Sequence, residues 1–388
     1  MGRRRLSQPD IPVKASIHGR YAWAIGAVVG VLALVWQHRS PQLPAVIGSG
    51  TRLNVDDLLQ YENMTIGDTM KRFPGDTLGF VTPWNSKGYD FVKKFARKFT
   101  MISPVWYQIG PSRALSGSHH VDEAWLNDLR QNNVQIVPRF TLEGWNAQHL
   151  FELLSDPKPF VDVIVKEVEK RRYDGVVLEA TQAILFADYL AASITDIPIP
   201  SFSESVIAEL GTRLKSLQKK LLIVVSPDKN ISKNEAMVAF GQYVSHIVVM
   251  TYDHSSRGRA GPNAPFDWVR QTITRIRDLP GIRPEQILLG LNFYGLEHAG
   301  PVDQSVLRPI VAHEYIQLLK ANKIEEISFL ESEREHVVRF RDKKGDVHSV
   351  FYPTMKSIQD RIGLARELGV GLQIWELGQG FQCFFYPL

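Results

Sequence analysis

Carboxylates and aromatic side chains recur at the ends of short apolar runs, and the most informative of these runs is YDGVVLEAT, Tyr173 to Thr181. An Asp-Gly turn opens it, and strand alternation places Val177, Glu179 and Thr181 on one face. A carboxylate on such a face can accept hydrogen bonds from sugar hydroxyls or, when protonated, act as a general acid. A threonine hydroxyl cannot donate a proton at useful pH. The stretch therefore predicts a ligand-binding strand whose one acid on this face is Glu179.

Other apolar runs end in the same way. The residues that we expect at a ligand site for this reason are Trp84, Trp106, Glu143, Trp145, Tyr252, Asp253, Asn292, Tyr294, Trp375 and Glu376. Aromatic faces stack on the C–H faces of a pyranose, and acids accept hydrogen bonds from its hydroxyls. The set predicts an oligosaccharide site, although any single Trp can instead pack beneath a loop.

The elements that must position these residues form a regular alternation from residue 78 onward. Apolar runs rich in Val, Ile and Leu lie at 78–84, 99–109, 134–145, 173–180, 220–227, 245–253, 286–295 and 370–378, with helix-like stretches between them. Nearly continuous apolar character is typical of parallel strands that are covered on both faces. Eight such runs predict an α/β fold, a (β/α)8 TIM barrel, with its ligand site at the carboxyl ends of the strands.

The connection between the seventh and eighth runs, about 296–353, is too long for a simple strand-to-helix unit. Within it HVVRFRDKKGDVHSVFYP has two alternating runs around a polar turn, which predicts a β-hairpin. A small α+β insertion between strands 7 and 8 is therefore expected, and it would wall one side of the barrel mouth.

The N-terminal part differs from the rest. The segments we predict are a basic cytosolic tail (1–20), a transmembrane signal anchor (21–37), a tether and lead-in (38–75) and the barrel (76–388). Tyr21 to Trp36 carries no charge but is slightly short against the roughly 20 residues that a spanning helix needs. Basic residues precede it, so the positive-inside rule places the N-terminus in the cytosol.

This predicts a single-pass type II membrane protein of the endomembrane system with a lumenal barrel. The alternative is a cleaved signal peptide, which would give a secreted or lysosomal protein. The sequons at Asn63 and Asn230 are candidate glycosylation sites that fit either compartment.

Charge and cysteine content exclude several classes of function. The net charge is +4, but residues 41–388 hold 39 basic and 40 acidic residues, so a nucleic-acid partner is not expected. The single cysteine, Cys383, excludes an intrachain disulfide and a Cys-based zinc site, and we expect it to be a buried apolar residue. His119 and His120 could bind a metal only with a further ligand, and a solvated pair is the expectation. No cofactor is expected.

The stretch YDGVVLEAT resembles the fourth strand of the glycoside hydrolase family 18 chitinases, whose motif is D-G-x-D-x-D-x-E. Asp174 and Gly175 match the motif, whereas Val177, Glu179 and Thr181 stand at the positions of its two inner Asp residues and its catalytic Glu. In that family the Glu protonates the leaving oxygen while the substrate acetamide attacks the anomeric carbon. The resemblance implies that this chain lacks the proton donor, whose step contributes about 10²–10⁴-fold.

Further motifs extend the resemblance. MTYD, Met250 to Asp253, is similar to the family's sixth-strand motif, in which the Tyr and Asp face the sugar, and Trp375 matches the Trp that floors the central subsite. Blocks such as VTPWNSKGYD, ISPVWYQI and ELGVGLQIWELGQG resemble one branch of the family, the chitinase domain-containing protein 1 branch. The resemblance implies a catalytically inactive barrel that binds oligosaccharides such as chito-oligosaccharides.

Two alternatives stay open. One is an active glycoside hydrolase whose acid has moved to Glu179, with Asp253 and Glu376 as the other acids at hand. The other is a protein-interaction scaffold with a lumenal or extracellular partner, in which residues 296–353 would be the contact region.

Overall fold

The computed structural model describes residues 50–180, 183, 202–227, 235–256, 260–300 and 306–388. The predicted membrane span (21–37), Thr181 and Asn230 lie outside these ranges. Within them, no helix is both long enough and apolar enough to cross a membrane.

The main sheet is built from the predicted apolar runs. Its parallel strands are β1 (Thr77–Val81), β2 (Met101–Pro104), β3 (Tyr107–Ile109), β5 (Gln135–Ile136), β6 (Arg139–Leu142), β7 (Gly175–Glu179), β8 (Lys220–Val225), β9 (His246–Val249), β10 (Ile287–Asn292) and β16 (Gly371–Trp375). The short β4 (Leu115–Ser116) is antiparallel to β3. Two of the runs are interrupted once, so that β2 and β3 share one run and β5 and β6 share another.

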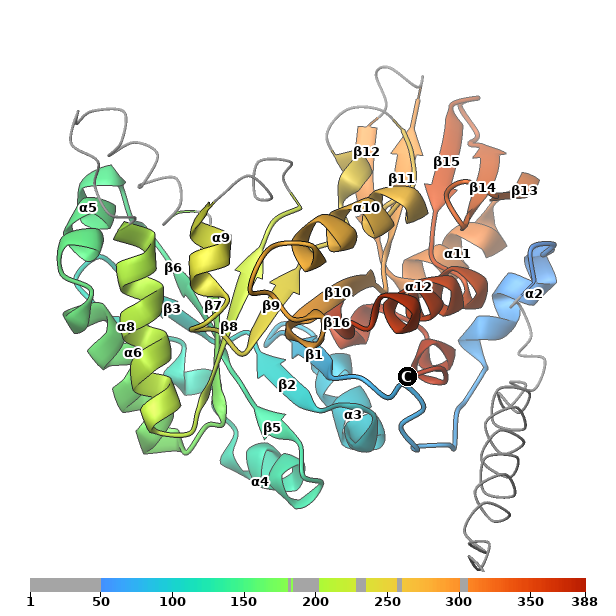
Figure 1. Ribbon diagram of the computed structural model, residues 1–388. Coiled ribbons are helices and arrows are strands. Elements are labelled where there is room, and N and C mark those ends of the chain that lie inside the picture. Colours follow the sequence, from blue (N-terminus) through green and yellow to red (C-terminus); the bar gives the residue numbers. More distant parts are fainter. Residues whose placement is uncertain (1–49, 181–182, 184–201, 228–234, 257–259, 301–305) are drawn as a thin grey trace, which may run out of the picture. The chain divides into compact units, whose positions relative to one another are not determined.

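The strand pairings show that the sheet curls around the barrel axis. β6 to β10 pair in order, β10 pairs with β16, β16 with β1, and β1 with β2. β2 then pairs with β5, and β3 with β6. The sheet therefore curls into the TIM-barrel-like fold that the apolar runs predict (Figure 1).

The interior of the barrel is apolar. Its buried cluster includes Leu78, Phe80, Val177, Leu222 and Val248, one or two from each contributing strand. Val177 is fully buried, which matches the inward face expected for it from the alternation along β7. Burying a side chain of this size contributes about 1.5–3 kcal/mol to folding.

Helices follow most of the strands and cover the sheet. The helices are α2 (Val55–Leu59), α3 (Ser86–Phe95), α4 (Glu123–Gln131), α5 (Ala147–Ser155), α6 (Lys158–Arg171), α8 (Phe202–Ser216), α9 (Glu235–Phe240), α10 (Phe266–Arg277), α11 (Ala312–Ala321) and α12 (Met355–Leu368). α4 illustrates why these segments form helices. Asp122 caps its N-terminus by accepting from the N–H of Trp125 at 3.1 Å, and Trp125, Leu126 and Leu129 form its buried face.

Short 3₁₀ turns complete the connections. They are η1 (Gln60–Glu62), η2 (Ala96–Lys98), η3 (Ser118–His120), η5 (His254–Ser256), η6 (Pro284–Gln286), η7 (Leu377–Gln379) and η8 (Gln382–Phe385). The last strand, β16, is followed by η7 and η8, where a regular barrel would have a helix.

A second sheet lies in the connection between β10 and β16. It is antiparallel, in the order β12 (Val306–Ile310), β11 (Gly295–Ala299), β15 (Val347–Phe351), β14 (Glu335–Arg341) and β13 (Ile324–Leu330), and Figure 1 shows α11 beside it. The hairpin expected from the sequence is formed by β14 and β15 around a turn in which Gly345 has φ +89°. The buried guanidinium of Arg361, on α12, donates to Glu335 at 3.3 Å and so attaches this sheet to the barrel helices.

Candidate functional site

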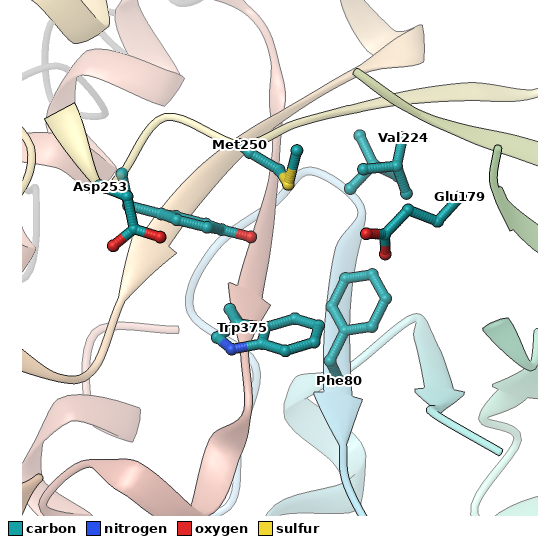
Figure 2. A pocket seen from close by; sticks show the side chains of 8 residues that line it. Phe80, Glu179, Val224, Met250, Asp253 and Trp375 are labelled. Atoms are coloured by element: carbon teal, nitrogen blue, oxygen red, sulfur yellow. The ribbon is translucent and has the colours of Figure 1, made fainter. Parts of the chain in front are cut away.

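A cavity of about 210 Å³ opens at the carboxyl ends of β1, β7, β8, β9 and β16. Its lining consists of Phe80, Glu179, Val224, Val248, Met250, Tyr252, Asp253 and Trp375 (Figure 2). It is smaller than the about 300–1,000 Å³ of a typical small-molecule pocket. It would therefore hold one ring or one substituent of a longer ligand.

Trp375 supplies the aromatic surface of this cavity. It is the last residue of β16, and its ring packs at a tilt against Phe80 with 5.5 Å between ring centroids. Figure 2 shows the side chains of Trp375, Phe80 and Glu179 directed toward the same cavity. A half-buried indole held in this way is pre-ordered for stacking on an apolar ligand face.

Glu179, the acid predicted from the sequence, forms an ion pair with Arg139. The two residues lie on neighbouring strands, β6 and β7, and the side chain of Thr141 adds a hydrogen bond to the main-chain oxygen of Glu179 at 3.1 Å. Glu179 is thus the acceptor of a guanidinium N–H while its carboxylate lines the cavity. Sequence reasoning missed Arg139, although it follows Gln135 and Val137 at two-residue spacing on the inward face of an apolar run.

Tyr294, Asp253 and Tyr252 form the polar side of the site. The hydroxyl of Tyr294 donates to Oδ1 of Asp253 at 2.5 Å, and the N–H of Asp253 donates to Oδ1 of Asn263 at 2.6 Å. These bonds hold Asp253 in a left-handed backbone conformation with φ +62°. Partial burial raises the pKa of the Asp253 carboxyl, and the Tyr294 hydrogen bond opposes that rise.

Tyr252 is prepared to act as a donor. The side-chain amide of Gln373 donates to the main-chain oxygen of Val249 at 3.2 Å and to the hydroxyl oxygen of Tyr252 at 3.4 Å. Burial raises the pKa of the Tyr252 phenol, which keeps its proton on. Because the oxygen already accepts from Gln373, the phenol proton can be directed toward a ligand.

Three residues expected at the mouth are instead buried. Trp106 is fully buried and donates through Nε1 to the hydroxyl of Tyr89 at 2.8 Å. Asn292 donates to the main-chain oxygen of Tyr294 at 2.8 Å, and Glu376 is 2% exposed. Their burial leaves almost no surface for a ligand, so the expectation that these three side chains contact a ligand is corrected.

Three others lie outside the cavity. Trp84 is 72% exposed on the loop after β1, and Glu143 is exposed on the loop after β6. Trp145 is half-buried; its Nε1 donates to the main-chain oxygen of Ile109 at 2.7 Å, and the guanidinium of Arg113 lies 4.6 Å from its ring centroid. The cation thus covers part of the ring that a sugar would need.

The remaining candidates lie elsewhere. Asn63 is exposed just after η1, and Cys383 is buried, with burial raising its thiol pKa to about 12. His119 and His120 contact each other with 3.9 Å between ring centroids, and burial lowers the pKa of His120. Across the described ranges, no three His, Cys, Asp or Glu side chains are grouped so as to hold a metal ion.

Comparison with known proteins gives consistent matches over the barrel. The family model "Glycosyl hydrolases family 18" matches residues 77–380. An uncharacterized glycosylase of Bacillus subtilis, YvbX, is 22% identical over 254 residues, which cover 63% of this chain and 69% of the relative. The cortical fragment-lytic enzyme of Bacillus anthracis is 26% identical over 149 residues, 37% of this chain and 34% of that enzyme.

Solved structures share the fold at low identity. A chitinase from Chromobacterium violaceum superposes with a TM-score of 0.68 at 16% identity, covering 81% of this chain and 97% of its own. The spore cortex-lytic enzyme SleL of Bacillus megaterium gives 0.65 at 17% identity, covering 80% and 72%. A family 18 chitinase from Cycas revoluta, solved in complex with (GlcNAc)4, gives 0.61 at 15% identity, covering 80% and 97%.

The family match spans the whole barrel, from the first residue of β1 to just beyond η7, and includes the second sheet. On this basis the chain belongs to glycosyl hydrolases family 18.

Proposed function

We propose that this protein is a chitinase-like carbohydrate-binding protein that has lost hydrolysis and binds oligosaccharides, such as chito-oligosaccharides, at the barrel mouth. The observation that carries the proposal is the cavity itself. It combines an aromatic surface (Trp375), a phenol donor (Tyr252) and two carboxylate acceptors (Glu179 and Asp253) with apolar walls. Such a mixture of stacking surface and hydrogen-bonding groups fits a sugar ring with an apolar substituent.

The loss of hydrolysis is proposed from the sequence of the fourth strand and from the ion pair. Thr181 stands where the family motif has its proton donor. Val177 stands at an inner acidic position of the motif but belongs to the apolar core. Glu179, the acid that remains on this face, already accepts from Arg139. This carboxylate oxygen is already engaged within the protein, which argues against a role in protonating a leaving group.

Two family relatives support the choice of ligand. The Cycas revoluta chitinase was solved with (GlcNAc)4, and the Bacillus anthracis relative is named a cortical fragment-lytic enzyme. We therefore favour oligomers of N-acetylglucosamine as the first ligands to test. Membership of the chitinase domain-containing protein 1 branch, a lumenal location behind residues 21–37 and glycans on Asn63 and Asn230 are parts of the same proposal.

Calorimetric titration with chitotetraose tests this function. Wild type should bind, and Trp375→Ala should weaken binding at least about tenfold, since the stacking surface is lost. Trp268→Ala is the control because it removes a half-buried indole that does not line the cavity. Absence of binding by wild type to chitotetraose and to a broad glycan array would refute the proposal.

The relocated-acid alternative predicts a different result. If Glu179 served as the proton donor, fluorogenic chito-oligosaccharides would be turned over and Glu179→Gln would abolish that turnover.

A further inference from the structure

Two loops of the barrel mouth are joined by a buried carboxylate. Asn85 follows Trp84 on the loop after β1, and Glu376 follows Trp375 at the end of β16. The side-chain amide of Asn85 donates to Oε2 of Glu376 at 2.6 Å, and the N–H of Gly378 donates to Oε1 at 2.9 Å. Both oxygens of the carboxylate are therefore used within the protein. We call this pair of side chains the Glu376–Asn85 clamp.

The surroundings of the clamp are shaped for it. Glu376 has φ +46° and ψ 90°, a backbone conformation that non-glycine residues rarely adopt and that persists only where neighbouring structure enforces it. A Cβ atom on Gly88 would lie 2.9 Å from Oε1 of Glu376, and one on Gly378 would lie 2.5 Å from the amide nitrogen of Asn85. Only glycine leaves room for the clamp at these two positions.

The side chain of Asn85 contacts Glu376 instead of capping the N-terminus of α3. Asn85 is the N-cap residue of α3, where an Asn side chain usually accepts from the first turn of the helix. Here the side chain makes no such cap bond and donates to Glu376 instead. The carboxylate in turn lies beside the first turn of α3. Burial raises the pKa of the Glu376 carboxyl, and the hydrogen bonds from Gly378 and Asn85 and the charge of Lys87 oppose that rise.

The position of the clamp indicates its role. Glu376 is too buried to touch a ligand, but each member of the clamp is bonded in sequence to a tryptophan: Trp84, which is 72% exposed, and Trp375, which lines the cavity. β1 and β16 are hydrogen-bonded neighbours, so the clamp adds a side-chain link just beyond the ends of two paired strands.

We propose that the Glu376–Asn85 clamp is a positioning device that fixes Trp84 and Trp375 in one relative geometry at the barrel mouth. Rupture of the clamp frees the loop after β1 and relaxes the turn that aims Trp375. This proposal depends on the proposed function only for the identity of the ligand. The effect of the clamp on the positions of the two tryptophans does not depend on any ligand.

Exchange of the two functional groups tests the clamp. Asn85→Asp sets a second carboxylate against Glu376. Glu376→Gln alone does not break the link, because either amide can rotate to pair a carbonyl oxygen with an NH2 group, so it serves only to complement Asn85→Asp. In the double variant Asn85→Asp/Glu376→Gln, the amide at position 376 can donate to the carboxylate at position 85. This restores the hydrogen bond with its direction reversed. Asn85→Ser breaks the link while leaving a good N-cap residue for α3, so it separates the clamp from helix stability.

Two readouts are needed. The first is the indole N–H resonances of Trp84 and Trp375 in ¹H–¹⁵N spectra, assigned with Trp84→Phe and Trp375→Phe; the second is chitotetraose affinity. Asn85→Asp and Asn85→Ser should each shift both resonances and weaken binding about tenfold, and the double variant Asn85→Asp/Glu376→Gln should return both resonances and come within about threefold of wild type. Glu331→Gln, on the exposed turn between β13 and β14, is the matched control and should change neither.

The clamp is refuted if Asn85→Asp and Asn85→Ser, shown to be folded by thermal unfolding, leave both resonances in place, or if the double variant is no closer to wild type than Asn85→Asp is. Failure of wild type to bind any saccharide would refute the proposed function, while the resonances would still decide for or against the clamp.

Discussion

Arg139, the first residue of β6, and Glu179, the last residue of β7, form an ion pair beside the cavity at the barrel mouth. The side chains are 16% and 32% exposed, so water screens the pair only in part. Glu179 is the acid that the fourth-strand sequence offers for catalysis. In the structure, one of its carboxylate oxygens accepts a hydrogen bond from the guanidinium of Arg139. On the proposed function, Glu179 would also accept hydrogen bonds from the ligand.

The first prediction concerns turnover. On the proposed function, wild type should release no product from fluorogenic chito-oligosaccharides between pH 4 and 8, because the sequence motif has Thr181 in place of the family's proton donor. Glu179→Gln should give the same flat result. Turnover by wild type that disappears in Glu179→Gln would show instead that the acid has relocated.

The second prediction concerns the ion pair and stability. Arg139→Met should lower the free energy of unfolding by about 1–3 kcal/mol, because it leaves a partly buried carboxylate without its partner. Arg139→Met combined with Glu179→Gln should recover part of that loss. Urea unfolding of wild type, both single variants and the double variant gives the coupling energy, and additive losses would contradict a stabilising pair.

The third prediction concerns Val177. Val177→Asp restores an acid of the family motif but places it in a fully buried apolar cluster, so it should cost about 3 kcal/mol or more of unfolding free energy. Val177→Ala, which only opens a small cavity, is the control and should cost less. If Val177→Asp is as stable as Val177→Ala, the inward face of β7 is hydrated and the account of its core is wrong.

The fourth prediction concerns pH. Burial raises the pKa of Glu335 to about 7, opposed by the charge of Arg361. The folded protein then holds this proton more tightly than the unfolded chain, so the stability that protonation contributes is present at low pH and is lost as pH rises through 7. Glu335→Gln removes this dependence.

The difference in unfolding free energy between Glu335→Gln and wild type should therefore increase by about 2 kcal/mol, in favour of the variant, from pH 5.5 to pH 8. Urea unfolding of both proteins at the two pH values measures it. An equal difference at both pH values would place the titration of Glu335 outside this range.

The barrel could be predicted from the sequence because its signals are local. Runs of Val, Ile and Leu mark strands covered on both faces, and residues at their ends mark the mouth. Four of the cavity residues, Glu179, Tyr252, Asp253 and Trp375, could be named on this basis.

The errors arise where the chain packs against itself. Trp106, Asn292 and Glu376 also lie within or at the ends of apolar runs, but all three are buried, and Trp106 packs against Trp125 of α4. A pattern of residue types along a run does not show which side chains other elements cover. Arg139 and Gln373 lie within apolar runs, where the apolar neighbours mask their inward direction. The clamp could not be predicted either, because Asn85 and Glu376 are 291 residues apart in sequence.

The most direct test of the account is a crystal structure of the protein soaked with chitotetraose. The account predicts an intact tetrasaccharide with one sugar ring against the indole of Trp375 and hydrogen bonds to Tyr252 and Glu179. A cleaved product in the cavity, or a cavity that stays empty at saturating ligand, would contradict it.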